Sequence, residues 1–414
     1  MPARHQTFAL GVLTSLFFMW GFCTCLNDIL FPLLKKIFVL NYTETTLIQF
    51  VFFGSYFVLS LAAAKLIERV GYKAAIVTGL LVMAAGSLVF IPAAGGLSYP
   101  VFLCGLFVLA GGITVLQVAA NPYVVALGPE RTASARLNLS QAFNSLATFV
   151  APVFGGVFIL SRTKVGTSAA GAVLNEAQRA ADAAALQLPY AGIALLLAVL
   201  AAVVWLTKLP VIPVQPKTRQ EANDNLWRHK NLVMGAVAIF VYVGAEVSIG
   251  NMLINYLSSP HISQMTAAAA AGYLSVYWGG AMLGRFVIGA AGMRYLTPSK
   301  ILADNCVAAV VLVGLSIVAS GPLAMWAILL VGLCNSIMFP TIFALAVKGL
   351  GPLTGRGSGV LIMAIFGGAV VPMLQALLAD ALGLTVSFVV PMLCYGYIWL
   401  FALKTFVDPR PMLA

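Results

Sequence analysis

Two acidic side chains, Asp28 and Glu246, lie inside long apolar stretches of the sequence. A carboxylate in the hydrocarbon region of a bilayer is costly, so it usually faces a water-filled cavity and serves a function. The alternative for Asp28 is a helix cap just before Pro32, and for Glu246 a protonated carboxyl hydrogen-bonded to nearby backbone. We favour the functional interpretation of both. Burial favours the neutral form of a carboxyl group, which suits Asp28 as a proton carrier. Glu246 could bind a substrate or carry a coupled ion.

Amide side chains recur at helical spacing in the same kind of stretch. Gln117 and Asn121 are four residues apart, on one helix face. Gln141 and Asn144 are three residues apart, again on one face. Their paired donors and acceptors match the vicinal hydroxyls of a sugar; the alternative is hydrogen bonding between helices. We predict substrate contact for Gln117, Gln141 and Asn144, and a structural role for Asn121. Further amides with the same predicted contact are Asn251, Asn255 and Asn335, and Gln375 is similar.

Aromatic residues in the same stretches could stack on the apolar face of a sugar ring. The candidates are Trp20, Phe22, Tyr277 and Trp278. Aromatic rings are also common where helices pack against one another, so each has this structural alternative. We retain Trp278 as a predicted substrate contact.

No arrangement typical of an enzyme is present in the sequence. There is no nucleophile elbow or phosphate-binding loop, and the three histidines are scattered. The six cysteines all lie in apolar runs and form no metal-ligand or disulfide pattern. A membrane enzyme such as a lipid-linked glycosyltransferase would need acidic or metal-binding outer loops, and the predicted outer loops have almost no such residues. We therefore predict no enzymatic activity, no metal and no cofactor.

The composition dictates the elements that must position these residues. Of 414 residues, 61% are apolar and only 8% are charged, whereas about a quarter are charged in a soluble domain. A helix crosses about 30 Å of hydrocarbon with about 20 apolar residues, and continuous rather than alternating apolar runs exclude a β-barrel. The twelve predicted spans cover residues 8–31, 46–67, 74–92, 101–127, 137–160, 189–208, 232–257, 267–291, 300–320, 323–347, 357–381 and 385–406.

The basic residues orient these spans. With the N-terminus in the cytoplasm, 18 of the 23 Lys and Arg residues, including Arg285, fall on the cytoplasmic side. Both termini are therefore predicted to be cytoplasmic. The same bias explains the net charge of +11 without a nucleic-acid partner. In the turn after the second span, we predict that Glu68, Arg69 and Lys73 form a gating latch, and the alternative is an ordinary positively charged loop.

The two halves of the chain repeat one another. Ser134-Ala135-Arg136 followed by Pro152 matches Thr354-Gly355-Arg356 followed by Pro372 at constant spacing. Two parallel six-helix halves are typical of the major facilitator fold, with the substrate at the midplane between them. We predict an all-α membrane protein of this fold, with an N-terminal half at 1–208, a cytoplasmic linker at 209–231 and a C-terminal half at 232–414. Residues 161–188 are predicted to form an outer loop that can contain a short surface helix.

Longer motifs make the chain similar to a known family. They are Asn27-Asp28-Ile29-Leu30, Gln117-Val118-Ala119-Ala120-Asn121-Pro122-Tyr123, Arg136-Leu137-Asn138-Leu139-Ser140-Gln141-Ala142-Phe143-Asn144-Ser145, Tyr242-Val243-Gly244-Ala245-Glu246 and Phe339-Pro340-Thr341-Ile342-Phe343. Together they resemble the fucose–galactose–glucose:proton symporter family, in particular its bacterial glucose/galactose transporters. The resemblance covers nearly the whole chain.

This resemblance implies roles for individual residues. The family's proton-linked Asp falls on Asp28, and its sugar-contacting Gln and Asn fall on Gln141 and Asn144. Fucose symporters have Glu where this chain has Gln117, and Gln where it has Glu246. The second acid therefore lies in the other half of this chain, and Gln117 can bind a hydroxyl but cannot carry a proton.

The resemblance also implies a function. We expect a symporter that imports a hexose such as glucose or galactose by alternating access, coupled to a proton, in a bacterial inner membrane. Its expected partners are the small-molecule sugar and membrane lipid, and we expect a monomer. The alternatives are sodium coupling, fucose or N-acetylglucosamine as the sugar, and a drug:proton antiporter, which would prefer an apolar cavity with fewer amides.

Overall fold

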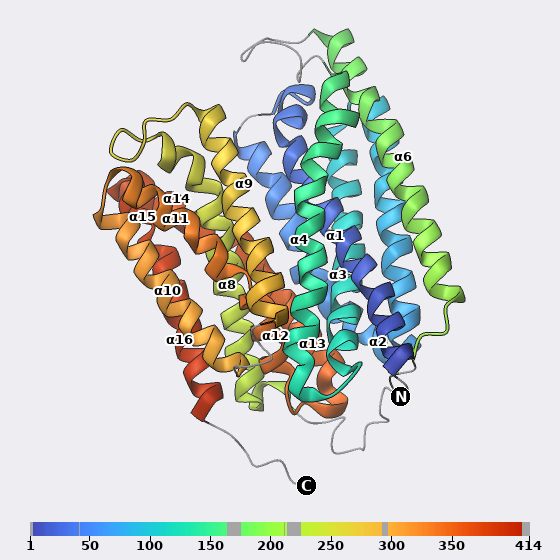
Figure 1. Ribbon diagram of the computed structural model, residues 1–414. Coiled ribbons are helices and arrows are strands. Elements are labelled where there is room, and N and C mark those ends of the chain that lie inside the picture. The colour runs from blue at the N-terminus through green and yellow to red at the C-terminus, as the bar shows by residue number, and fades with distance from the viewer. Residues whose placement is uncertain are drawn as a thin grey trace. The chain divides into compact units, whose positions relative to one another are not determined.

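The chain folds into helices that group into two compact units. The computed structural model describes residues 3–40, 42–163, 175–210, 212, 225–291 and 297–407, and all regular structure among them is helical (Figure 1). The all-α prediction is therefore confirmed. One unit comprises Met1–Tyr123 and Leu146–Val214, and the other comprises Val124–Ser145 and Gln215–Ala414. The boundary falls inside helix α4, after Ser145, whereas the predicted division at the linker 209–231 stays a prediction.

The first unit is built on a few long helices. Aromatic residues in its core connect α2, α3 and α6. The ring centroid of Phe90 in α2 lies 4.9 Å from that of Phe102 in α3 and 4.5 Å from that of Tyr190 in α6. Its elements are α1 (Ala3–Ile37), α2 (Tyr42–Gly95), α3 (Tyr99–Ala126) up to Tyr123, α4 (Ala133–Phe158) from Leu146, the 3₁₀ turn η2 (Leu160–Arg162) and α6 (Glu176–Leu206). The 3₁₀ turn η1 (Glu130–Thr132) and the first part of α4 belong to the other unit.

Helix α2 contains two of the predicted spans. Its central residue Gly71 has φ 81° and ψ 169°, which interrupts the helical geometry. A side chain would be strained in that conformation, so glycine is needed for the turn. The apolar stretch Leu47–Gly95 has 49 residues. At about 1.5 Å per residue it is more than twice as long as the roughly 30 Å hydrocarbon layer.

Helix α6 begins earlier than the predicted span. Asn175 and Gln178 form a capping box: the Asn175 side chain accepts from the Gln178 N–H at 2.8 Å, and the Gln178 side chain accepts from the Asn175 N–H at 3.0 Å. These bonds satisfy free N–H groups at the helix end. The short helix that was predicted within the outer loop 161–188 is therefore the first part of α6. This part of α6 contains the buried residue Asp182.

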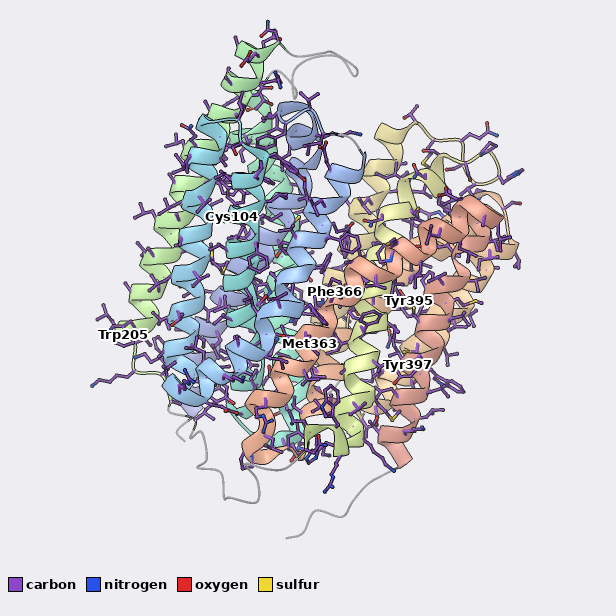
Figure 2. The ribbon with its side chains drawn as sticks, turned by 180° about the vertical axis from the view of Figure 1, so that it is seen from behind. Cys104, Trp205, Met363, Phe366, Tyr395 and Tyr397 are labelled. Atoms are coloured by element: carbon purple, nitrogen blue, oxygen red, sulfur yellow. The ribbon has the colours of Figure 1, made fainter. Side chains whose placement is uncertain are left out.

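The second unit is organised around α8, which packs against α9, α12, α14 and α16. Two of its long helices are interrupted, at Asn335–Met338 and at Met363–Gly367, near the labelled Met363 and Phe366 in Figure 2. Its elements are η3 (Leu226–Arg228), α8 (Lys230–Ser258), α9 (Ala267–Gly284), the π-helix η4 (Arg285–Ala291), α10 (Pro298–Val318), α11 (Gly321–Asn335), α12 (Met338–Val347), η6 (Gly351–Leu353), α13 (Thr354–Met363), η7 (Ala364–Phe366), α14 (Gly367–Leu382), α15 (Leu384–Ser387) and α16 (Val389–Val407).

The helices have the length and hydropathy of membrane spans. Among the residues that the structure describes, nine are long and apolar enough to cross a bilayer, with the doubled stretch in α2 counted once. The predicted count of twelve spans stays a prediction.

Candidate functional site: a buried ion pair and its tyrosines

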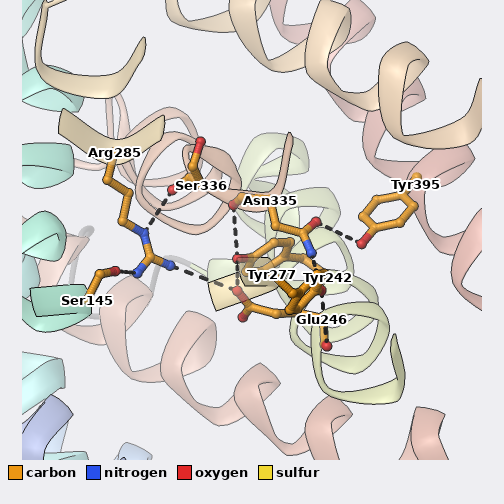
Figure 3. A network of polar contacts seen from close by, with 8 residues as sticks. All are labelled: Ser145, Tyr242, Glu246, Tyr277, Arg285, Asn335, Ser336 and Tyr395. Carbon is orange, nitrogen blue, oxygen red and sulfur yellow. Dashed lines mark hydrogen bonds and ion pairs between the residues drawn. The ribbon is translucent and has the colours of Figure 1, made fainter. Parts of the chain in front are cut away.

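The second unit contains an ion pair in its interior. The Arg285 Nη2 atom lies 3.9 Å from Glu246 Oε1, and the side chains are only 11% and 14% exposed (Figure 3). Glu246 lies in α8, and Arg285 is the first residue of η4. A buried charge without a partner is destabilising, so each of the two side chains makes the other tolerable in an apolar bundle.

Arg285 is buried in the helical bundle. Its guanidinium also donates to the Ser336 carbonyl oxygen at 2.9 Å and to the Ser145 hydroxyl. A carboxylate, a carbonyl and a hydroxyl thus satisfy this guanidinium, and the sequence does not place these groups beside it. The assignment of Arg285 to the cytoplasmic side stays a prediction.

Three buried tyrosines belong to the same hydrogen-bonded network as the carboxylate. The Tyr242 hydroxyl donates to Glu246 Oε1 at 2.8 Å. Asn335 donates to the Tyr277 hydroxyl at 2.8 Å and accepts from the Tyr395 hydroxyl at 2.7 Å. The Asn335 carbonyl oxygen also lies 3.1 Å from the Tyr242 hydroxyl. Asn335, predicted to contact substrate, is thus part of the frame that holds the tyrosines beside Glu246 (Figure 3).

The network offers both donors and acceptors of hydrogen bonds. A carboxylate, an amide and phenol hydroxyls can donate and accept in turn, which suits a ligand made of hydroxyl groups. The network contains no nucleophile paired with a general base. In the described part of the chain, no group of three or more His, Cys, Asp or Glu could hold a metal ion.

The predicted amides of α4 lie in the same unit. Gln141 is buried and Asn144 is half-buried, and both precede Ser145, which accepts the hydrogen bond from Arg285. The structure thereby places Gln141 and Asn144 on the helix segment that the ion pair holds. Their contact with a substrate stays a prediction.

The predicted residues of α3 and α1 belong to the other unit. Gln117 is buried and donates to the Tyr56 hydroxyl at 3.1 Å. Asn121 is fully buried, and α3 continues past Pro122 to Ala126. The backbone of Asp28 lies in α1, but its side chain is outside the described part of the structure. Its role in coupling stays a prediction.

The remaining predicted substrate contacts are not part of the hydrogen-bonded network that Figure 3 draws. Asn251 and Asn255 are exposed on the later turns of α8. Trp278 is 37% exposed, and its ring lies edge-on to that of Tyr277 at 5.2 Å. Tyr277 itself is a network residue, so Trp278 adjoins the site through this contact.

The predicted gating residues flank the break in α2. Glu68 and Arg69 precede Gly71, and Lys73 follows it. The Lys73 ammonium lies 5.8 Å from the ring centroid of Trp205 at the end of α6 (Figure 2), within reach of a cation–π interaction. This contact anchors the turn to α6, and a gating role stays a prediction.

The sequence contained a signal for Arg285 and for one of the tyrosines. Arg285 is a lone charge in the apolar run from Ala281 to Ala291, which is the signal used for Asp28 and Glu246. Tyr277 was among the aromatic candidates, whereas Tyr242 and Tyr395 were not, and only the packing of α8, α9 and α16 brings the three together.

The fold and the network together define a multi-pass membrane transporter, and comparison with known proteins gives its family. The model of the Major Facilitator Superfamily matches residues 8–372. The chain belongs to this superfamily, which indicates a transporter rather than an enzyme.

Two relatives and one solved structure are similar to nearly the whole chain. The chain is 51% identical to the glucose/galactose transporter of Brucella abortus biovar 1 (strain 9-941) over 97% of its length and 94% of the relative's. It is 35% identical to the L-fucose-proton symporter of Escherichia coli (strain K12), over 97% of this chain and 93% of that protein. The crystal structure of the Escherichia coli fucose:proton symporter superposes with a TM-score of 0.87 at 33% identity, covering 97% of this chain and 99% of the other.

Proposed function

We propose that this chain imports a hexose, such as glucose or galactose, together with a proton. The observation that carries the proposal is the 51% identity, over 97% of the chain, to a protein named as a glucose/galactose transporter. The 35% identity to an L-fucose-proton symporter supports the proton as the coupled ion. The polar network around Glu246 supports a substrate with several hydroxyls.

In this proposal Glu246 binds the sugar. Its carboxyl oxygens can accept hydrogen bonds from sugar hydroxyls, and Arg285, at 3.9 Å, and the Tyr242 hydroxyl, at 2.8 Å, hold the group in place. Gln141 and Asn144 provide further donors and acceptors from α4, and Gln117 from α3.

The coupled proton binds at Asp28 in this proposal. A loaded carrier with a neutral Asp28 moves through its cycle without an uncompensated charge in the low-dielectric region, which lowers the cost of the transition. Release of the sugar on the other side is followed by release of the proton. We further propose that the chain acts as a monomer in a bacterial inner membrane with both termini in the cytoplasm, which the distribution of basic residues supports.

Uptake into proteoliposomes tests the proposal. Purified protein is reconstituted, and radiolabelled glucose, galactose, fucose and N-acetylglucosamine are offered with an inward proton gradient, an inward sodium gradient, or neither. Concentrative uptake of glucose or galactose that requires the proton gradient is the expected result. Empty liposomes serve as the control.

The other outcomes are informative as well. Uptake that requires only the sodium gradient would show that sodium, and not the proton, is the coupled ion. Concentrative uptake of fucose or N-acetylglucosamine without glucose or galactose would change the substrate. Uptake of none of the four sugars under any gradient would refute the proposed function.

A further inference from the structure

A hydrogen bond between Gln117 and Tyr56 joins two long helices of the first unit. The Gln117 Nε2 atom donates to the Tyr56 hydroxyl at 3.1 Å, and the two residues are only 7% and 3% exposed. Gln117 lies in α3, and Tyr56 lies in the part of α2 that precedes Gly71. The helices come close in this region, because a Cβ atom on Gly111 would lie 2.6 Å from Leu59 Cδ1. A tyrosine of α2 can therefore reach an amide of α3.

The Tyr56 ring is held by two aromatic neighbours on its own helix. Its centroid lies 5.8 Å from that of Phe52, one turn earlier, and 6.3 Å from that of Phe53. The rings of Phe52 and Phe53 meet edge to face, at 89° and 5.5 Å. Aromatic pairs at such distances attract one another. The Tyr56 hydroxyl thus approaches Gln117 from a ring that is packed in place.

This hydrogen bond occupies one end of the Gln117 amide. A primary amide has two N–H donors and one acceptor oxygen, and among the described residues Gln117 makes no other hydrogen bond. Its Oε1 atom is not one of the fully enclosed side-chain atoms that lack a partner. The amide oxygen is therefore accessible to a further donor while the nitrogen end is held.

Asn121, one turn later in α3, differs from Gln117. It is fully buried, and within the described part of the chain its Nδ2 and Oδ1 atoms are both enclosed and have no hydrogen-bond partner. A ligand cannot contact an enclosed amide unless the helices move apart. Of these two amides on one face of α3, only Gln117 has one end fixed and the other end accessible.

We propose that Tyr56 is a positioning residue for Gln117, and that this pair recognises one hydroxyl group of the sugar. Tyr56 holds the Nε2 end of the amide, so Oε1 is presented as an acceptor and the sugar hydroxyl donates to it. An analogue without that hydroxyl leaves the acceptor unpaired and binds more weakly. The inference rests on the proposed function, in which Gln117 contacts the sugar.

Competition with modified sugars tests the pair. Uptake of radiolabelled glucose, or of galactose if only that sugar is transported, is measured in proteoliposomes against unlabelled analogues of the same sugar. Each analogue carries hydrogen or fluorine in place of the hydroxyl at carbon 2, 3, 4 or 6. At the recognised carbon, both analogues should compete about three- to tenfold more weakly than the parent sugar. Fluorine should not restore binding, because it cannot donate a hydrogen bond.

Two variants should remove this discrimination at the same carbon. In Tyr56→Phe and in Gln117→Leu, the KM of the parent sugar should rise about three- to tenfold, and the two analogues should then compete as well as the parent sugar. The matched control is Tyr123→Phe, which also removes a hydroxyl from a buried tyrosine, but one that donates to the Pro210 carbonyl oxygen at 2.5 Å. This control should keep the wild-type order of affinities. A purely structural role of Tyr56 would lower stability without changing that order.

The measurement separates the possible outcomes. Unchanged discrimination at all four carbons in Tyr56→Phe would overturn the proposal, and so would an equal change in Tyr123→Phe. A recognised carbon at which the fluorinated analogue competes as well as the parent sugar would also overturn it, because the amide would then act as the donor. If Tyr56→Phe does not accumulate sugar, the same competition is measured by equilibrium binding in detergent. Absence of uptake by wild type itself would instead refute the proposed function.

Discussion

Removing one charge from the Glu246–Arg285 pair should destabilise the second unit far more than removing both. At 3.9 Å, two unit charges attract by about 4 kcal/mol at an effective dielectric constant of about 20. Removing one partner of a buried pair costs about 3–5 kcal/mol, because the other is left buried and uncompensated. Since both side chains retain some exposure, we expect about 3 kcal/mol for Glu246→Gln and for Arg285→Gln. The double variant should lose only about 1 kcal/mol.

The native cysteines provide the assay. Cys23, Cys306, Cys334 and Cys394 are buried, so a thiol-reactive fluorophore reports their exposure as the protein in detergent is heated. At about 2–4 °C per kcal/mol, each single variant should melt about 6–12 °C below wild type, and the double variant only a few degrees below it.

The exposed pair Glu130–Lys348 is the matched control. Its side chains are 65% and 64% exposed, so Glu130→Gln and Lys348→Gln should change the melting temperature by no more than about 2 °C. Our reasoning fails if Glu246→Gln and Arg285→Gln behave like these control variants. It also fails if their losses simply add in the double variant, because additive losses mean that the two charges do not interact.

Three further predictions concern single residues. Asp28→Asn should abolish concentrative sugar uptake yet preserve sugar exchange in proteoliposomes, and intact concentrative uptake would remove Asp28 from the coupling step. Gly71→Ala should lower the stability by about 1–3 kcal/mol, because only glycine tolerates its backbone conformation. By contrast, Gly192→Ala, which has open space around its Cβ in α6, should stabilise the protein by about 0.5–1 kcal/mol; equal melting temperatures for the two variants would contradict this. Asn335→Leu should raise the KM for sugar and lower the melting temperature, since the buried Tyr395 hydroxyl loses its acceptor and the Tyr277 hydroxyl loses a donor; an unchanged KM would exclude the tyrosine frame from substrate binding.

The features that the sequence predicted are those set by local composition. A run of apolar residues must be a helix in lipid wherever it packs, because its backbone has no other hydrogen-bond partners. A lone carboxylate in such a run, as at Glu246, likewise needs a polar partner, because a buried charged group without a partner is costly. Gly71 between charged residues marks the turn within α2, since glycine there relieves a local strain.

The features that could not be predicted depend on contacts between distant segments. The partner of Glu246 is 39 positions later, Arg285, and Tyr395 comes from the last helix. Periodicity shows which side chains share a face, as with Gln141 and Asn144, but not which other helix meets that face. The burial of Arg285 could not be predicted for this reason: a lone arginine in an apolar run is equally compatible with the membrane surface and with a buried counter-ion.

The geometry of Arg285 explains how substrate binding and conformation can be linked in this chain. Its planar guanidinium offers five N–H donors in a fixed fork, so it can hold a carboxylate, a carbonyl and a hydroxyl in different directions at once. Here these are Glu246, the Ser336 carbonyl and Ser145 of α4. In the proposed function, a sugar hydroxyl bound to Glu246 would weaken the attraction of this carboxylate for Arg285, and Arg285 would then hold α4 differently. No long pathway is needed for such coupling, because one side chain contacts both the proposed binding group and α4.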